Sequence, residues 1–147
     1  MANTDTNTVG FQLKQITTEQ FAIIQDTFDK TNNEINMSIG IKFGLNTDEK
    51  TIASFVKVQF EQDKKPFLIT EVANHFNIDE KAWNDFLINK NKLILPKGFA
   101  SHLVMLTVGT LRGVLHSKTE NTKFNQFILP TINVIELIKD DVAIDIE

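Results

Sequence analysis

Three histidines are the residues with the widest chemical range in this chain, and their spacing limits what they could do together. His75 lies near the end of a predicted strand, whereas His102 and His116 lie on one predicted helix. The two helix histidines are 14 positions apart, which at 1.5 Å per residue places them about 21 Å apart along the axis. They cannot share a metal ion within one chain, so we predict no metal site.

Other catalytic signatures are also missing from the sequence. The chain contains no cysteine, no Gly-rich phosphate loop, no nucleophile elbow and no Ser/His/Asp spacing, which excludes thiol catalysis and removes the usual sequence signals of phosphoryl and acyl transfer. We therefore predict a protein that is not an enzyme, with no catalytic residue and no cofactor. A hotdog-like thioesterase or dehydratase stays as an alternative, with His102 as its candidate, although the helix offers no nearby acid partner.

Composition and charge place the chain among single-domain proteins. It has 147 residues, 41% of them hydrophobic, and a net charge of −4; an acidic chain without Lys/Arg clusters argues against nucleic-acid binding. The first residues lack a basic and apolar leader, and the apolar runs fall short of the roughly 18 residues that a membrane span needs. We expect a cytoplasmic protein without membrane insertion, with a disordered tail at 1–8, one domain at 9–139 and a frayed acidic tail at 140–147.

Period-two patterns predict an antiparallel sheet. The clearest is the alternation of Met37, Ile39, Ile41, Phe43 and Leu45 with small or polar residues, as expected of a strand with one buried face. Short polar turns separate this strand from its neighbours, which predicts a meander. Pro66 is expected to restrict the third strand of the meander to residues after it. The remaining predicted segments are a first strand at 9–17, an extended or bulged stretch at 21–28, and strands at 51–61 and 67–75.

A long apolar helix follows the sheet. Asp79 predicts the N-cap of a short helix at 80–88, and a longer helix is expected from Phe99 to Leu115. The long helix is apolar on more than one side, so a short chain needs a partner to cover it. We predict that one stripe (Phe99, Leu103, Leu106) packs on its own sheet. The other stripe and the GxxxG edge are predicted to form a subunit interface through Val104, Val108, Gly109, Leu111, Gly113 and Leu115.

The aromatic residues are an unusual set, with 12 Phe, one Trp and no Tyr. One interpretation is a Phe-rich core. The other is that some of the Phe side chains line an adaptable apolar surface.

Four segments, in the same order along the chain, resemble the SecB-type export chaperones. The opening strand Phe11–Ile16 resembles the first strand of that family, and Leu68–Val72 resembles its aliphatic-x-Glu-Val strand. Leu95-Pro96 resembles the Phe-Pro entry to its long helix, and Asn125–Leu137, with Pro130 before Ile132-Asn133, resembles its Leu-x-Pro-Val-Asn-Phe signature. The resemblance extends over about residues 9–138.

The resemblance implies a fold and a function. The fold is α+β: a four-stranded antiparallel sheet with a long helix and one or two short helices packed on one side. The assembly is a homotetramer, a dimer of dimers with the long helices between the sheets. The function is ATP-independent holding of unfolded or extended polypeptides for export, with the SecA motor docked through the sheet face at Ile69 and Glu71. In the family the clients lie in long apolar grooves, and such grooves bind extended chains with little sequence preference. The residues that we predict to bind client peptides are Phe43, Phe55, Phe76, Trp83 and Phe86.

Some positions depart from the family pattern. The acidic character expected after the first strand is only partly kept at Glu19-Gln20, and the tail does not resemble a SecA-binding tail. A SecB-like chaperone for another client, such as an antitoxin or a mobile-element protein, is therefore an alternative. A further alternative is an oligomeric structural or regulatory module with the same fold and no client holding.

Overall fold

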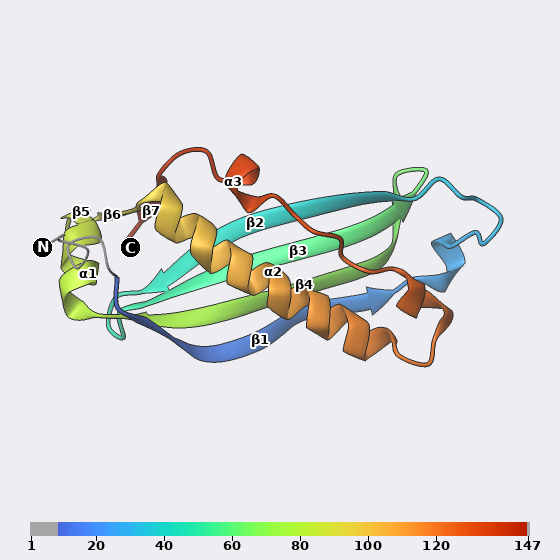
Figure 1. Cartoon of the computed structure of the whole chain (residues 1–147), viewed down its shortest axis with the longest axis horizontal. Coiled ribbons are helices and arrows are strands. Elements are labelled where there is room, and N and C mark those ends of the chain that lie inside the picture. The colour runs from blue at the N-terminus through green and yellow to red at the C-terminus, as the bar shows by residue number, and fades with distance from the viewer. Residues whose placement is uncertain (1–8, 147) are drawn as a thin grey trace, which may run out of the picture.

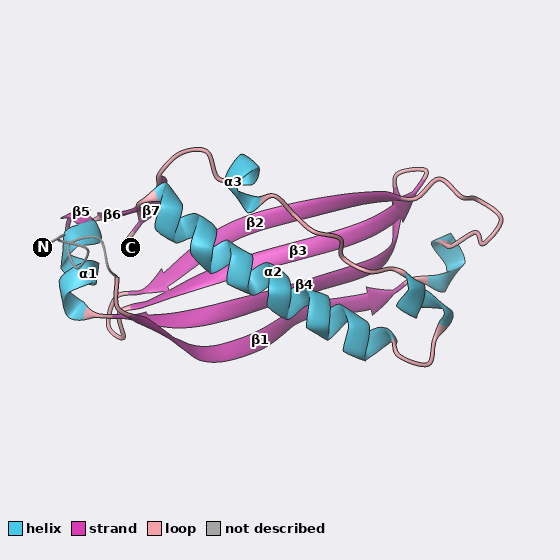
Figure 2. Cartoon of the chain, viewed as in Figure 1, coloured by secondary structure: helices cyan, strands magenta, loops and turns pink. Residues whose placement is uncertain are grey.

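The computed structural model describes residues 9–146 and shows an α+β fold with one long helix laid across a four-stranded antiparallel sheet (Figures 1 and 2). The strand order is β1-β4-β3-β2, which leaves β1 and β2 at the edges. The predicted fold class is confirmed, while the expected disordered tail at 1–8 lies outside the described residues. The sheet and the helix that lies on it consist of β1 (Phe11–Ile23), β2 (Asn36–Asn46), β3 (Thr51–Gln62), β4 (Lys65–Ile78) and α2 (Lys97–Thr119).

The meander forms where the period-two patterns predict it, with one difference at its second turn. β3 and β4 are joined by Asp63 and Lys64, both with positive φ, as in the two-residue turns that match strand twist. β4 begins at Lys65 and includes Pro66, so the expectation that the strand starts after the proline is wrong. A register shift between Phe60 and Glu61 lies beside Pro66, and such irregularities are where a sheet tolerates proline.

The two edge strands differ in regularity. β1 is longer than predicted and covers the first part of the stretch at 21–28, to Ile23, with register shifts between Leu13 and Gln15 and between Thr18 and Gln20. A short 3-10 turn, η2 (Gln25–Thr27), follows it. The expectation of extended chain is wrong for Gln25–Thr27, which form this helical turn. β2 pairs with β3 without a shift over Asn36–Asn46. Bulges protect an edge strand against pairing with other chains, so β2 is the less protected edge.

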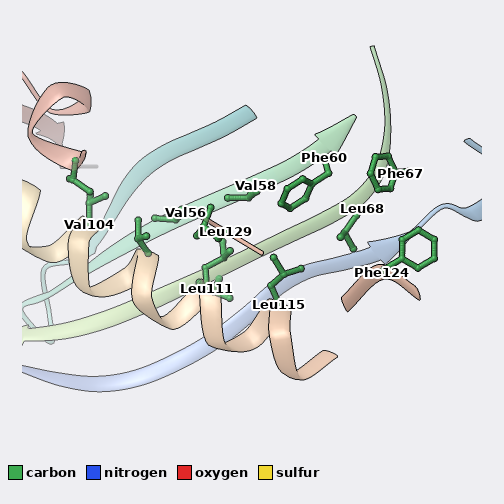
Figure 3. Packing of buried hydrophobic residues seen from close by; sticks show 13 residues of the cluster. Val56, Val58, Phe60, Phe67, Leu68, Val104, Leu111, Leu115, Phe124 and Leu129 are labelled. Carbon is green, nitrogen blue, oxygen red and sulfur yellow. The ribbon is translucent and has the colours of Figure 1, made fainter. Parts of the chain in front are cut away.

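One face of α2 packs on the sheet and builds the main core (Figure 3). The stripe Val104, Val108, Leu111 and Leu115 is buried against β3 and β4, whose inward residues include Val56 and Leu68. This corrects the prediction that these four residues contact another subunit. Their side chains have almost no exposed surface with which to contact a partner. The reason is that the sheet covers a wider part of the helix surface than one stripe of side chains.

A second core lies beyond one end of the sheet. It contains the buried aromatic residues Phe76, Trp83 and Phe86, and it is enclosed by a short helix and a small three-stranded sheet of order β5-β6-β7. Asp79 caps the short helix as predicted, accepting a bond from Ala82 N–H at 2.7 Å. The elements here are α1 (Glu80–Phe86), β5 (Leu87–Asn89), β6 (Lys92–Leu95) and β7 (Val142–Asp145).

The C-terminal segment is ordered, which the sequence did not lead us to expect. After η3 (Lys123–Gln126) the chain runs back over the sheet to α3 (Val134–Leu137), as Figure 1 shows. It then pairs with β6 as strand β7, so the expectation of a frayed tail from Asp140 onward is wrong for the described residues. The alternation of Val142, Ile144 and Ile146 with exposed neighbours supplies the reason, because these aliphatic side chains pack on the second core.

The long helix also corrects the expectation about membrane spans. By length and composition, α2 is long and apolar enough to cross a bilayer. In this fold its residues Leu103, Val104 and Leu111 are fully buried on the sheet. The core helix of a soluble protein passes the same test of length and composition.

Candidate polypeptide-binding groove

A groove of about 570 Å³ runs between the edge strand β2 and the returning C-terminal chain. α2 crosses the sheet diagonally (Figure 1) and packs mainly on β3 and β4, with little contact to β2. Ile39, Ile41 and Phe43 are consequently half-buried, although they belong to the apolar face of the strand. The opposite wall is formed by the C-terminal segment through Leu137, Ile138, Val142, Ala143, Ile144 and Asp145.

The groove presents the two features that an extended peptide needs. One is the unshifted outer edge of β2, whose backbone groups can pair with an added strand. The other is the row of side chains at alternate positions, which offers a shallow apolar contact on one side of that edge. Lys42 is the single charged side chain in the 11-residue strand. The arrangement therefore suits an extended chain of mixed sequence better than a small polar ligand.

The five residues predicted to bind clients fall into three different places. Phe43 lines the groove. Phe55 lies on the opposite face of the sheet. Phe76, Trp83 and Phe86 are buried, with 1%, 3% and 6% of their surfaces exposed. These three cannot contact a client while the second core is closed, since aromatic side chains at core positions have no free surface.

Phe55 is held on the outer face of the sheet by its neighbours. The Lys42 Nζ lies 4.9 Å from the ring centroid, the His75 ring is 6.3 Å away, and a Cβ on Gly44 would approach the Phe55 ring to 3.4 Å. Cation–π contact and close packing over a glycine explain why an outward Phe is only half-exposed. Phe55 thus has a local structural role on a face distinct from the groove.

The residues predicted to dock a partner lie on this same outer face. Ile69 is buried, with 7% of its surface exposed, and Glu71 is half-buried opposite Lys57 on the neighbouring strand. A hollow of about 280 Å³ beside them is lined by Gly40, Ile41, Lys42, Lys57 and Glu71. The face is mixed in charge at this point. Docking of SecA here stays a prediction, resting on Glu71 more than on Ile69.

The solvent side of α2 carries the glycines of the predicted interface. Cβ atoms built on Gly109 and Gly113 meet nothing within 4 Å among the described residues, so packing within the chain does not require glycine at either place. Each glycine costs about 1 kcal/mol in a helix relative to alanine. A hollow of about 430 Å³ runs from these glycines to β1, where Ile16 is 50% exposed.

The three histidines lie in separate parts of the structure. His102 lines a hollow of about 470 Å³ with Lys97, Ser101, Met105 and four other residues, none of them acidic. Its ring stacks edge-on against Phe11 at 5.7 Å. His75 Nε2 lies 2.9 Å from the Thr17 hydroxyl, which donates to Glu19 at 2.6 Å on the open sheet face.

Within residues 9–146, no group of three or more His, Asp and Glu side chains is placed to hold a metal ion. The pKa of Asp29 is lowered by hydrogen bonds from the Thr31 side chain and backbone, as in a turn where an aspartate accepts from residue i+2. This carboxyl lies away from the groove and stabilises the loop before β2.

Most of the groove was missed at the sequence level. Ile39 and Ile41 were correctly predicted to share one face of a strand, but the alternation gave no sign that this strand lies at an edge. The C-terminal wall was missed because its acidic residues suggested a solvated tail. The signal that could have revealed it is the period of two in Val142, Ile144 and Ile146.

Comparison with solved structures found a SecB-like chaperone of Mycobacterium tuberculosis, determined in complex with a ChAD peptide from the HigA1 antitoxin. The two chains share 9% sequence identity over an alignment that covers 84% of this chain and 91% of that one, with a TM-score of 0.42. No family model and no curated protein sequence matches the chain.

Proposed function

We propose that this protein is an ATP-independent, non-enzymatic chaperone that holds unfolded or extended polypeptides in the groove beside β2. The observation that carries the proposal is the row of half-buried Ile39, Ile41 and Phe43 along an edge strand that pairs without a register shift. Main-chain pairing gives affinity without sequence preference, and the alternate apolar contacts favour clients with exposed hydrophobic residues. Such segments are what an unfolded chain exposes.

Assembly into a homotetramer belongs to the same proposal. Of the predicted interface it keeps Gly109 and Gly113, and exposed neighbours on α2 take the place of the four buried residues. The surface available to a partner is the solvent side of α2, with Met105, Leu106, Gly109 and Gly113, continued by Ile16 of β1. Met105 and Leu106 are 48% and 42% exposed, and exposed apolar residues gathered on one face mark association sites. The groove at β2 lies at the other edge of the sheet and stays free for clients.

Suppression of aggregation tests the holding function. A chemically unfolded test protein is diluted into buffer with a stoichiometric amount of the chaperone, and light scattering is followed. We expect wild type to suppress scattering and Ile39→Asp to lose most of this effect, because a charge in the groove opposes apolar contact. Ser38→Asp, on the exposed face of the same strand, is the matched control and should behave as wild type. No suppression by wild type would reject the function.

Binding to the export motor SecA is tested separately from client holding. Glu71→Arg reverses the charge of the residue on which SecA docking most depends and leaves the groove unchanged. We expect the variant to suppress aggregation normally and to lose any binding to SecA. Unchanged SecA binding would reject this docking site, and no SecA binding by wild type would favour clients outside the export route.

A further inference from the structure

The C-terminal strand is bound to the rest of the molecule in the way that a client strand would be. β7 pairs antiparallel with β6 from Leu95↔Val142 to Lys92↔Asp145, and Ile146 N–H extends the ladder to Asn91 O at 2.8 Å. Its aliphatic side chains at alternate positions are half-buried, whereas the residues between them are exposed. Main-chain pairing with alternate apolar contacts is the general mode of strand addition.

The hydrophobic core on which β7 packs contains both aliphatic and aromatic side chains. The second core contains Phe76, Trp83 and Phe86 together with half-buried Phe11 and Phe99, and the Val142, Ile144 and Ile146 side chains pack against it. The rings contact one another edge-on or tilted, as in Phe86–Phe99 at 5.5 Å and Phe11–Phe99 at 5.4 Å. Removing β7 would expose an apolar surface next to a free strand edge on β6.

This covered surface is continuous with the groove described above. Val142, Ala143 and Ile144 of β7 form part of the groove wall, and Phe43 packs against both hydrophobic cores. A client that lies along β2 therefore reaches β7 at one end of the groove. β7 has four residues and lies at the edge of its sheet, and segments with few buried apolar contacts open at a lower free energy than the core of a fold.

We propose that β7 occupies a second polypeptide-binding site in cis, and that an extended client segment with aliphatic side chains at alternate positions replaces it. The inference rests on the proposed client-holding function and extends it to the aromatic residues that the closed structure buries. In the closed state β7 competes at the high effective concentration of a tethered segment. Only molecules in which β7 is detached can bind a client at the second site, so the apparent affinity falls in proportion to the open fraction. A change that weakens the pairing of β7 therefore raises the apparent affinity of the second site.

Two matched variants test the proposal in the full-length chain. The probe is a fluorescein-labelled peptide with the sequence of Val142–Ile146. Ile144→Asp places a charge under β7 and should release the strand, so the peptide should bind at least tenfold more tightly than to wild type. Ile135→Asp makes the same substitution at a 68% exposed residue of α3 and should leave the affinity unchanged. Equal affinity for the two variants would overturn the proposal.

Trp83 reports on the same event without a label. It is the single tryptophan of the chain and is 3% exposed in the second core. Its emission should shift to longer wavelength in Ile144→Asp and return toward the wild-type position when the peptide binds. Thermal unfolding shows whether the variant is folded, and a cooperative transition with no emission shift would contradict release of β7.

A reversible disulfide between β6 and β7, called the lock below, tests the proposal without a destabilising substitution. Because Ile146 N–H bonds to Asn91 O, the alternation of an antiparallel ladder makes Ile94 and Ala143 a non-hydrogen-bonded pair, with Cα atoms about 4.5 Å apart and within reach of a disulfide. Ile94→Cys with Ala143→Cys gives the cysteine-free chain one possible bridge within a single chain. The oxidised protein should bind the peptide at least tenfold more weakly than the same protein after reduction.

The outcomes of the lock separate this inference from the proposed function. Equal peptide binding by the oxidised and reduced forms, or no binding by the reduced form, overturns the second site even if aggregation is still suppressed. Loss of aggregation suppression in wild type rejects client holding itself. A disulfide that joins two chains would identify the occupant as the β7 of a second copy and would also overturn the proposal.

Discussion

The contribution of the groove to client binding can be calculated for its two isoleucines. Ile39 and Ile41 are half-buried in the free protein, and full burial of an aliphatic side chain is worth about 1.5–3 kcal/mol. Completing that burial under a client contributes roughly 1 kcal/mol for each residue. Replacing both with alanine should therefore weaken client binding by about 2 kcal/mol, or roughly 30-fold in Kd.

The assay is fluorescence anisotropy with a labelled, permanently unfolded polypeptide. The matched control replaces two other isoleucines, Ile88 and Ile128, which are 59% and 64% exposed outside the groove. It deletes the same atoms and should change Kd less than twofold. A thermal unfolding curve for each variant shows that the protein is folded at the assay temperature.

Two results would contradict contact between the groove and the client. If the Ile39/Ile41 double variant binds with wild-type affinity, the groove does not contact the client. If the Ile88/Ile128 variant weakens binding as much, the effect comes from general surface hydrophobicity and not from the edge of β2.

Three further predictions concern the rest of the fold. Gly109→Leu should dissociate the proposed assembly in sedimentation while the thermal midpoint of the protein does not fall, because the protomer has space at this position; an unchanged assembly mass would contradict the interface. Leu111→Ala should destabilise the chain by about 2–5 kcal/mol, since the side chain is fully buried under the sheet; denaturant titration measures the loss, and a change below about 1 kcal/mol would contradict the core packing. Asp79→Ala should cost about 1 kcal/mol through loss of the α1 N-cap bond, whereas Asp79→Asn should recover most of it; equal stability of the two variants would contradict the capping role.

The sheet could be predicted from the sequence because its strands have one apolar face. The alternation from Met37 to Leu45 marks β2, and Asp63-Lys64 marks the turn into β4. The prediction about Pro66 was wrong because a shift in register accommodates the ring inside the strand. Such a shift depends on the partner strand and leaves no local signal.

The long helix shows how far a hydrophobic pattern can be interpreted. The stripe from Val104 to Leu115 was correctly predicted to be covered, but its cover is the chain's own sheet. A pattern of apolar residues shows that a face is buried and does not show which molecule buries it. Leu106 shows the converse, because it was placed in the stripe facing the sheet and is 42% exposed.

Aromatic residues were the hardest to assign from sequence. Phe43 and Phe76 both lie on strands of the same sheet, yet one is half-buried at an edge and the other is in the core. The difference comes from strand order, which places β2 at an edge and β4 inside the sheet. Strand order is set by long-range pairing, so residue type and spacing could not distinguish a client-binding phenylalanine from a core residue.

Photo-crosslinking from the two faces of the sheet tests the central claim most directly. A photoreactive phenylalanine analogue is placed at Phe43 in the groove or at Phe55 on the opposite face, and the protein is irradiated with an unfolded client. We predict strong crosslinks to the client from position 43 and few from position 55. Crosslinks from position 55 with none from position 43 would contradict the claim that the groove beside β2 holds the client.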